Sequence, residues 1–283
     1  YDDLYNSLLR SEDSKLELQH LGRVVQMIGL HETAYCAQHN HMVVSKLPPR
    51  QRYQYMQNPS VIPVNNLFIE LNHVCVFGRK HPDSVVTSIN QMYASASIAH
   101  LMVQQRIKAW AESSRGMFIL RSSDAAKGGA GQPQSKFVQW KEAKEDPALA
   151  KKIVWTSMKR FGRAIEKLLR NYQHKPSRLL DVSRNCIIFA TVSDLTLALG
   201  NIITDDNIRV ERLKNRLDPS HSSDETAGYR DVCLNLRVVN KQAMSLGADM
   251  HVCEVQLILL DFAKLRTSEG HKRYVDARNQ AGV

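Results

Sequence analysis

The sequence predicts an α+β fold, in which a mainly helical N-terminal region is followed by a mixed β-sheet flanked by helices. The strongest observation is the alternation of polar and apolar residues from Asp231 to Val238, which is typical of a strand with two different faces. A second apolar run, 252–259, follows after a polar connection that contains Gly247. The two runs are therefore expected to form adjacent antiparallel strands. Helix-like patterns on either side of them complete the prediction.

Residues 1–120 are expected to form a mainly helical domain. An apolar stripe with helical spacing covers 16–30, and a second one covers 84–110. Four prolines between positions 48 and 63 favour loops in the intervening segment. Residues 66–76 fit either a further helix or a buried strand.

Residues 121–138 are expected to form a flexible linker between two domains. The segment 121–136 consists largely of Gly, Ser, Ala and Gln, and it offers almost no apolar surface to bury. The second domain is then expected to span 139–283.

The second domain begins with an amphipathic helix expected over 148–172, with an apolar face and a basic face. A short strand over 185–190, a helix from Ser193 to Gly200 and a basic strand over 208–217 are expected next. The two alternating strands follow, and a helix over 260–278 closes the chain. Helices packed on such a sheet make one α+β unit.

The composition is that of a globular protein, with 43% hydrophobic and 23% charged residues. No apolar run approaches the roughly 20 residues of a membrane span. The sequence begins at Tyr1, which leaves open a targeting segment that has been removed. The five cysteines show no paired spacing, so we expect reduced thiols in an intracellular compartment, either the cytoplasm or an organelle matrix.

The formal net charge of +10 favours polyanionic partners such as nucleotides, RNA or acidic protein surfaces. A merely solvated basic surface is the alternative. His31, Cys36, His39 and His41 lie close together in the sequence, but their spacing fits no standard zinc site and only one of them is a thiol.

Glu254 and Gln256 lie two residues apart in an otherwise apolar strand, so they share one face of it. A carboxylate and an amide in such a strand are costly unless they are paired or functional. We expect Asp231, Glu254 and Gln256 to face one cleft, with Arg230 at its edge.

These residues resemble the synthetase domain of the RelA/SpoT family. The resemblance consists of Gly228-Tyr229-Arg230-Asp231 opening one strand, Glu254-Val255-Gln256 on the next, Asp181 opening an earlier strand, and a late helix with His271 and Tyr274. It covers roughly the C-terminal half. Members of this family transfer pyrophosphate from ATP to the 3′ hydroxyl of a guanosine nucleotide. The resemblance therefore implies a nucleotidyltransferase fold for 139–283.

The resemblance also implies roles for individual residues. Asp181 and Glu254 would hold Mg²⁺, and these two with Gln256 would be the catalytic residues. Tyr229 would stack on the acceptor base. The other implied nucleotide-binding residues are Lys159, Arg160, Arg163, Arg184, Lys214, Arg216, Arg230 and His271. The alternatives are an ion pair of Glu254 with Arg184 or Arg230, a solvated basic helix face, and a Tyr229 that only packs at the start of its strand.

Several family positions differ in this chain. Ala164 lies where the family has a serine, Cys233 where it has a histidine, and Leu257-Ile258-Leu259 where it has an arginine. Arg184 follows Asp181 by three residues rather than five. The resemblance, together with these differences, thus implies a divergent nucleotide-binding protein that uses Mg²⁺ and ATP to transfer pyrophosphate to a nucleotide or to an RNA 3′ end. The alternative is a catalytically inactive basic scaffold or assembly subunit of an RNA–protein complex, for example one in an organelle.

Overall fold

A computed structural model describes residues 1–38, 61–63, 86–121 and 136–266. The expected linker segment 122–135, the uncertain segment 66–76 and the residues His39, His41 and His271 lie outside this part of the chain.

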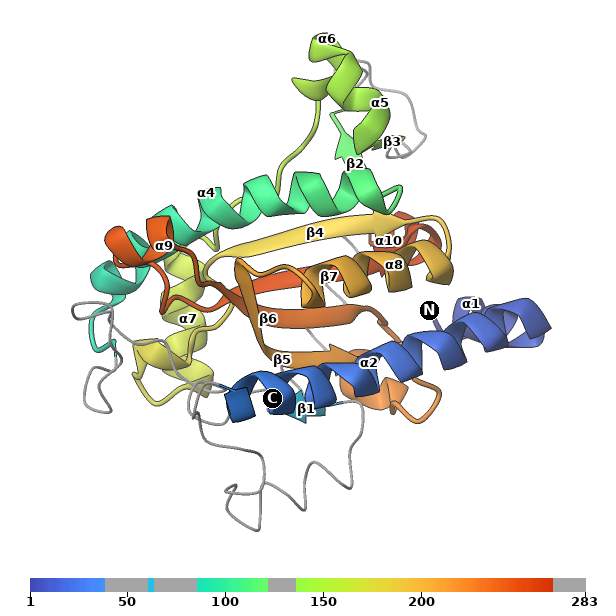
Figure 1. Cartoon of the computed structure of the whole chain (residues 1–283), viewed down its shortest axis with the longest axis horizontal. Coiled ribbons are helices and arrows are strands. Elements are labelled where there is room, and N and C mark those ends of the chain that lie inside the picture. The colour runs from blue at the N-terminus through green and yellow to red at the C-terminus, as the bar shows by residue number, and fades with distance from the viewer. Residues whose placement is uncertain (39–60, 64–85, 122–135, 267–283) are drawn as a thin grey trace.

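The fold is α+β, as the sequence predicts, and it is built on one mixed sheet of seven strands in the order β1-β5-β6-β7-β4-β2-β3 (Figure 1). Only β4 and β7 pair in parallel, and all other neighbours are antiparallel. The strands are β1 (Val61–Pro63), β2 (Met117–Leu120), β3 (Lys136–Gln139), β4 (Arg184–Phe189), β5 (Ile208–Asn215), β6 (Val232–Val238) and β7 (Cys253–Leu259).

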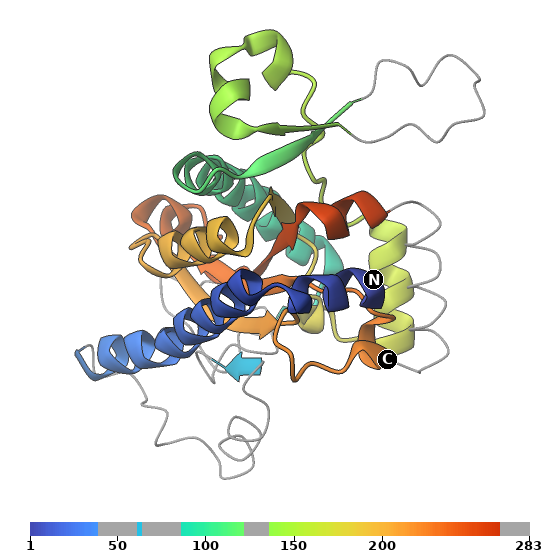
Figure 2. The ribbon, with the colours of Figure 1, turned by 90° about the vertical axis from the view of Figure 1, so that its right-hand side faces the viewer.

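Helices cover both faces of the sheet. They are α1 (Asp2–Arg10), α2 (Glu12–Gln38), α4 (Ile89–Ser113), α5 (Trp140–Glu145), α6 (Pro147–Ala150), α7 (Phe161–Asn171), α8 (Val192–Ile203), α9 (Lys241–Ser245) and α10 (Leu260–Leu265), with short 3₁₀ turns η2 (Pro176–Arg178) and η3 (Ser223–Thr226). Figure 2 shows α2 and α8 on one side of the sheet and α7 and α10 on the other. No helix among the described residues is long and apolar enough to cross a membrane.

The alternation predicted for 231–238 is confirmed in β6, because Leu234 and Leu236 lie in the core while Cys233 and Asn235 share the opposite face. That opposite face is not open as expected, since Asn235 is only 2% exposed. The strand registers align Asn235 with Glu254 and Glu254 with Arg184. We call this side of the sheet the polar sheet face.

The hydrophobic core is shared by both sides of the expected domain boundary. One continuous cluster runs from Tyr5 in α1 through α4 to Ala263 in α10. β2 and β3, which flank residues 122–135, pair with each other, and β2 also joins β4. Residues 136–138 of the expected linker are therefore part of a strand.

The helix expected over 148–172 is wrong in its first half. Only α6 and α7 are helical, and residues 151–160 between them are not part of a helix. Ile153 bridges Leu120 of β2, and the Val154 N–H donates to the Ile119 carbonyl at 2.8 Å. Ile153, Val154 and Thr156 are β-branched and Trp155 is aromatic, and such residues favour extended backbone that packs on a sheet.

Candidate functional site

Glu254 lies where the parallel strands β4 and β7 begin. Its backbone N–H donates to the Ser183 carbonyl at 2.8 Å, and its Cα is in register with Arg184. Asp181 lies three residues before β4, so the two predicted metal-binding carboxylates come from neighbouring segments at the same end of the sheet. The negative charge of Asp181 is one of the causes that raise the pKa of Glu254, which places the two groups in one electrostatic environment.

Asp181 is held by two lysines of the basic segment before β4. Lys159 and Lys167 both donate to its Oδ2 atom, Lys167 from 3.0 Å. Burial alone would raise the pKa of Asp181, but the two ammonium charges outweigh it and lower the pKa to about 2. The Oδ1 atom of Asp181 is buried and accepts no hydrogen bond. The carboxylate is therefore ionised and has one oxygen without a partner.

Glu254 is in the opposite situation. Burial is the main cause that raises its pKa, followed by the charge of Asp181. Within the described part of the chain, its carboxylate takes part in no hydrogen bond or ion pair, although Arg184 lies directly opposite. The alternative interpretation, an ion pair with Arg184 or Arg230, is therefore not what the structure contains.

Gln256 belongs to a hydrogen-bonded chain that crosses the polar sheet face. Its Nε2 atom donates to Asp231 at 3.1 Å, and Arg216 donates to the other Asp231 oxygen. Arg266 in turn donates to the Gln256 Oε1 atom at 3.3 Å. Asp231, which is fully buried, thus joins Gln256 to Arg216. Both of these residues are neighbours of the two carboxylates, Asp181 and Glu254.

Tyr229 lies at the end of this chain, where the N-terminal segment covers part of it. The Tyr1 ring meets it edge-on with centroids 5.8 Å apart, and the Arg266 guanidinium lies 5.9 Å from its ring centre. Gly228 just before it has a φ of +80°, a conformation that glycine adopts readily.

The remaining predicted residues occupy different positions. The Arg230 guanidinium donates to the carbonyls of Arg216, Asp218 and His221 and lies 3.7 Å from the Tyr5 ring centre, so it anchors a loop and is not part of the proposed site. Arg160 and Arg163 are exposed at the start of α7, and Arg163 pairs with Glu166.

Lys214 lies on β5 in register with Cys233, which puts it on the polar sheet face. Sequence reasoning did not include Lys167 or Arg266 among the site residues. Lys167 was visible only as one of several basic residues near Lys159. Arg266 lies beyond the last strand, and no sequence signal linked it to Gln256.

The carboxylates fit a magnesium ion. Mg²⁺ is usually bound through one or two carboxylates together with substrate phosphates. The Asp181 Oδ1 atom and the Glu254 carboxylate are oxygens of this kind without a partner. Among the described residues no cluster of three or more His, Cys, Asp or Glu side chains is arranged to hold a metal alone, so binding would depend on the phosphates as well.

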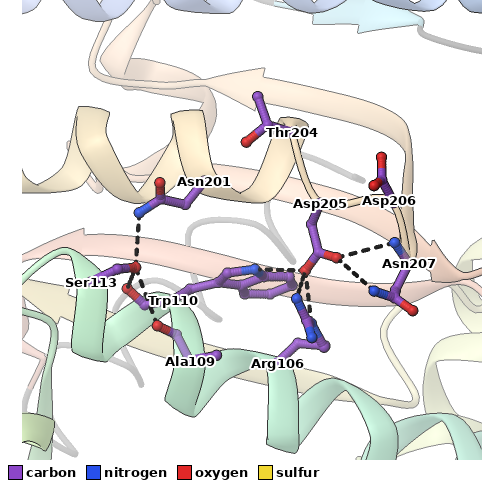
Figure 3. A pocket seen from close by; sticks show the side chains of 9 residues that line it. All are labelled: Arg106, Ala109, Trp110, Ser113, Asn201, Thr204, Asp205, Asp206 and Asn207. Carbon is purple, nitrogen blue, oxygen red and sulfur yellow. Dashed lines mark hydrogen bonds and ion pairs between the residues drawn. The ribbon is translucent and has the colours of Figure 1, made fainter.

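An open groove of about 400 Å³ lies elsewhere, between α4 and the end of α8 (Figure 3). Its central carboxylate, Asp205, accepts hydrogen bonds from Arg106, from the Trp110 Nε1 atom at 3.0 Å and from Asn207. Because these polar groups satisfy one another, the groove is explained by the packing of α4 against α8. No residue of the polar sheet face lines it.

No family model matches the sequence, and no curated protein matches it. Among solved structures, the small alarmone synthetase 1 from Bacillus subtilis, bound to its product pppGpp, matches with 16% sequence identity and a TM-score of 0.33. The match covers 44% of this chain and 68% of the synthetase. A likeness of this extent does not establish a shared activity.

Proposed function

We propose that this protein is a divergent nucleotide-binding protein that transfers pyrophosphate from ATP, with Mg²⁺, to the 3′ hydroxyl of a nucleotide or of RNA. The observation that supports the proposal is an ionised, lysine-bound Asp181 whose charge acts on a half-buried Glu254, and the Glu254 carboxylate forms no hydrogen bond or ion pair with the described residues. Carboxylates whose pKa is perturbed by burial and by neighbouring charges concentrate at functional sites.

The cations beside Asp181 provide the phosphate-binding groups of the site. Lys159 and Lys167 place two ammonium groups at the Asp181 carboxylate. Arg184 is near enough that its charge acts on Lys159. They would bind and neutralise the triphosphate of ATP. Asp181 and Glu254 would hold Mg²⁺, which would supply positive charge to offset the negative charge that develops on the phosphates.

The proposed transfer forms one bond and breaks one bond. The acceptor hydroxyl oxygen bonds to the β-phosphorus of ATP, and the bond from that phosphorus to the α–β bridging oxygen breaks. AMP leaves with the bonding electron pair, and the hydroxyl proton passes to the Glu254 carboxylate.

Gln256 and Tyr229 would position the acceptor. Gln256 is held by Asp231 and Arg266, so its amide is fixed relative to Glu254 two residues away. A nucleobase next to Tyr229 would gain stacking energy of about 1–3 kcal/mol. The Tyr1 side chain would have to move if the base approached from its side.

The alternative function is that of a basic scaffold or assembly subunit in an RNA–protein complex. One observation favours it: both lysines already bind Asp181, which is how a structural ion-pair cluster would look. Under this alternative the protein catalyses no pyrophosphate transfer, and Glu254 is a remnant of an active site that has been lost.

A pyrophosphate-transfer assay separates the two functions. Labelled ATP is offered with GDP, GTP and short RNA as acceptors. We expect transfer to at least one acceptor and a loss of about 10²–10³ in rate for Glu254→Gln, with much of the ATP binding retained through Asp181, Lys159 and Lys167. Glu142→Gln, on an exposed position of α5, is the matched control and should transfer normally. The absence of transfer to every acceptor would contradict the enzyme proposal and leave the scaffold.

A further inference from the structure

A segment without acidic residues leads from the outer part of the sheet to Asp181. Residues 151–163 contain five cations, Lys151, Lys152, Lys159, Arg160 and Arg163, and no Asp or Glu. Lys151, Lys152 and Arg160 are exposed, and none of these three forms an ion pair with the described residues. Unpaired cations in a row are available to an anionic partner.

Further cations lie where this segment begins. The Arg121 N–H donates to the Lys152 carbonyl at 2.8 Å, and Leu120 is in register with Lys136 of β3. Arg121, Lys136 and Lys152 are therefore at the same end of three adjacent extended segments, and all three are exposed. Figure 1 shows that β2, β3, α5 and α6 project from the body of the molecule beyond α4.

The same segment also ends at the candidate site. The Lys159 N–H donates to the Val182 carbonyl at 2.9 Å, and the Lys159 ammonium binds Asp181. From Lys151 to Lys159 an extended chain spans at most about 30 Å. An anionic polymer bound along this segment would have one end at Asp181.

An exposed aromatic side chain lies next to the cations. Phe161 is 48% exposed, and its ring lies 5.5 Å from that of Tyr93. Sites for single-stranded nucleic acids combine a positive track for the backbone with aromatic rings on which bases stack. An acidic protein segment would need the charges but not the exposed ring, so the combination favours RNA.

We propose that single-stranded RNA binds along Arg121, Lys136, Lys151, Lys152, Arg160 and Phe161, which we call the basic strip, and that its 3′ hydroxyl is the acceptor at Glu254. The inference rests on the proposed function for the identity of the reaction. It specifies the acceptor as a polymer: the RNA 3′ oxygen bonds to the β-phosphorus of ATP, AMP leaves, and the proton goes to Glu254. The position of the strip is independent of that reaction.

The first test measures binding of a 5′-fluorescein-labelled polyuridine of about 15 nucleotides by fluorescence anisotropy. We expect Lys151→Glu/Lys152→Glu to weaken binding about tenfold or more. The slope of log K against log salt should fall by about 0.7 for each phosphate that the variant no longer neutralises. The charge-matched control, Arg10→Glu/Lys241→Glu, changes exposed cations on α1 and α9 and should bind within about twofold of the unchanged protein. An equal loss in both variants would overturn the strip, because net charge alone would then explain binding.

The second test separates RNA from an acidic protein. Phe161→Leu removes the ring but keeps an apolar side chain, and it should weaken polyuridine binding about fivefold or more, whereas Phe161→Tyr should not. Polyglutamate of the same number of charges serves as the competitor. If polyglutamate displaces the RNA at equal concentration and Phe161→Leu binds normally, the strip is a face for acidic proteins and the proposal fails.

The third test places the 3′ end. Polyuridine with a photoreactive 4-thiouridine at its 3′ end is expected to crosslink within residues 159–186, and RNA carrying it at the 5′ end is not. Crosslinking of both ends to the same peptide, or of the 3′ end elsewhere, would overturn the assignment of the acceptor. Calorimetry of Mg²⁺-ATP on the Lys151→Glu/Lys152→Glu variant should give unchanged affinity. RNA binding by the strip in a protein that binds no ATP would refute the proposed function and leave the strip.

Discussion

Arg184 and Glu254 lie directly opposite each other on the parallel strands β4 and β7, yet their side chains form no ion pair within the described structure. A guanidinium and a carboxylate in such positions would normally combine, because an uncompensated buried charge costs free energy. Burial and then the charges of Asp181 and Asp231 raise the pKa of Glu254, and they outweigh the charges of Lys167 and Arg216, which lower it. The site thus keeps a carboxylate that no residue of the described chain binds in an ion pair.

Glu254→Gln is expected to stabilise the protein. A carboxyl group whose pKa is raised in the folded state contributes stability that is present below its ordinary pKa and lost as the pH rises through the folded-state value. The variant should therefore raise the free energy of unfolding by about 1 kcal/mol at pH 8 and have little effect near pH 4. Urea denaturation at both pH values is the measurement, with Glu142→Gln as the control. A destabilised variant would mean that Glu254 is held by a partner.

Lys159 and Lys167 are expected to stabilise the fold through Asp181. Lys159→Met/Lys167→Met leaves a buried carboxylate without its cations and should lower the free energy of unfolding by about 3 kcal/mol at pH 7. Adding Asp181→Asn should restore part of the loss. Because the pKa of Asp181 is lowered to about 2, its contribution is present above its ordinary value of 3.8 and disappears as the pH falls towards 2. If the double variant unfolds at the same urea concentration as the unchanged protein, the lysines do not hold Asp181 in solution.

His251 is expected to make the fold sensitive to acid. Burial, and then the charge of His100, lowers the pKa of His251 to about 3, and its Nδ1 atom lies 3.0 Å from the Ser95 hydroxyl. The unfolded chain takes up a proton near pH 6.5, so stability falls between about pH 6.5 and pH 3, by about 2 kcal/mol at pH 5 relative to pH 8. His251→Gln should flatten this part of the stability profile. If the free energy of unfolding of His251→Gln falls as steeply between pH 7 and pH 5 as that of the unchanged protein, His251 is not held neutral in the folded state.

Gly228→Ala is expected to disturb the contact between Tyr1 and Tyr229. A Cβ atom there would lie 2.9 Å from the Tyr1 Cβ atom, and the backbone has a positive φ. Gly247→Ala has the same backbone problem but no atom within 4 Å of the new methyl group, which makes it the matched control. We expect a loss of about 1–2 kcal/mol for Gly247→Ala from backbone strain and a larger loss for Gly228→Ala, measured by thermal unfolding. Equal losses would show that Tyr1 does not pack against Gly228.

The parts of the fold that the sequence predicts are those that depend on local residue patterns. Alternation in 231–238 and the shared parity of Glu254 and Gln256 determine which side chains face together, because successive strand residues point to opposite sides. The basic and apolar residues of 148–172 also suit a helix, but Ile153 is placed by its pairing with Leu120, a residue far away in the sequence. Tertiary pairing of this kind overrides local propensity.

The sequence predicts which residues belong to the candidate site better than it predicts which of them are in contact. Asp181, Glu254 and Lys159 were identified from motif order, and the structure brings Asp181 and Lys159 into contact. The second lysine, Lys167, and the role of Arg266 depend on how α7 and α10 dock on the sheet, which no spacing in the sequence encodes. Arg230 has the charge of a nucleotide-binding residue, but three backbone carbonyls occupy its guanidinium.

Isothermal titration calorimetry of ATP tests the central claim, that the Asp181–Glu254 face binds a metal–nucleotide complex, most directly. The titration is done with Mg²⁺ and with EDTA, on the unchanged protein, on Lys159→Ala and on the control Lys241→Ala. We expect binding that requires Mg²⁺, is weakened about tenfold or more by Lys159→Ala, and is unaffected by Lys241→Ala. No binding, or binding that is equally strong in EDTA and in Lys159→Ala, would contradict the account.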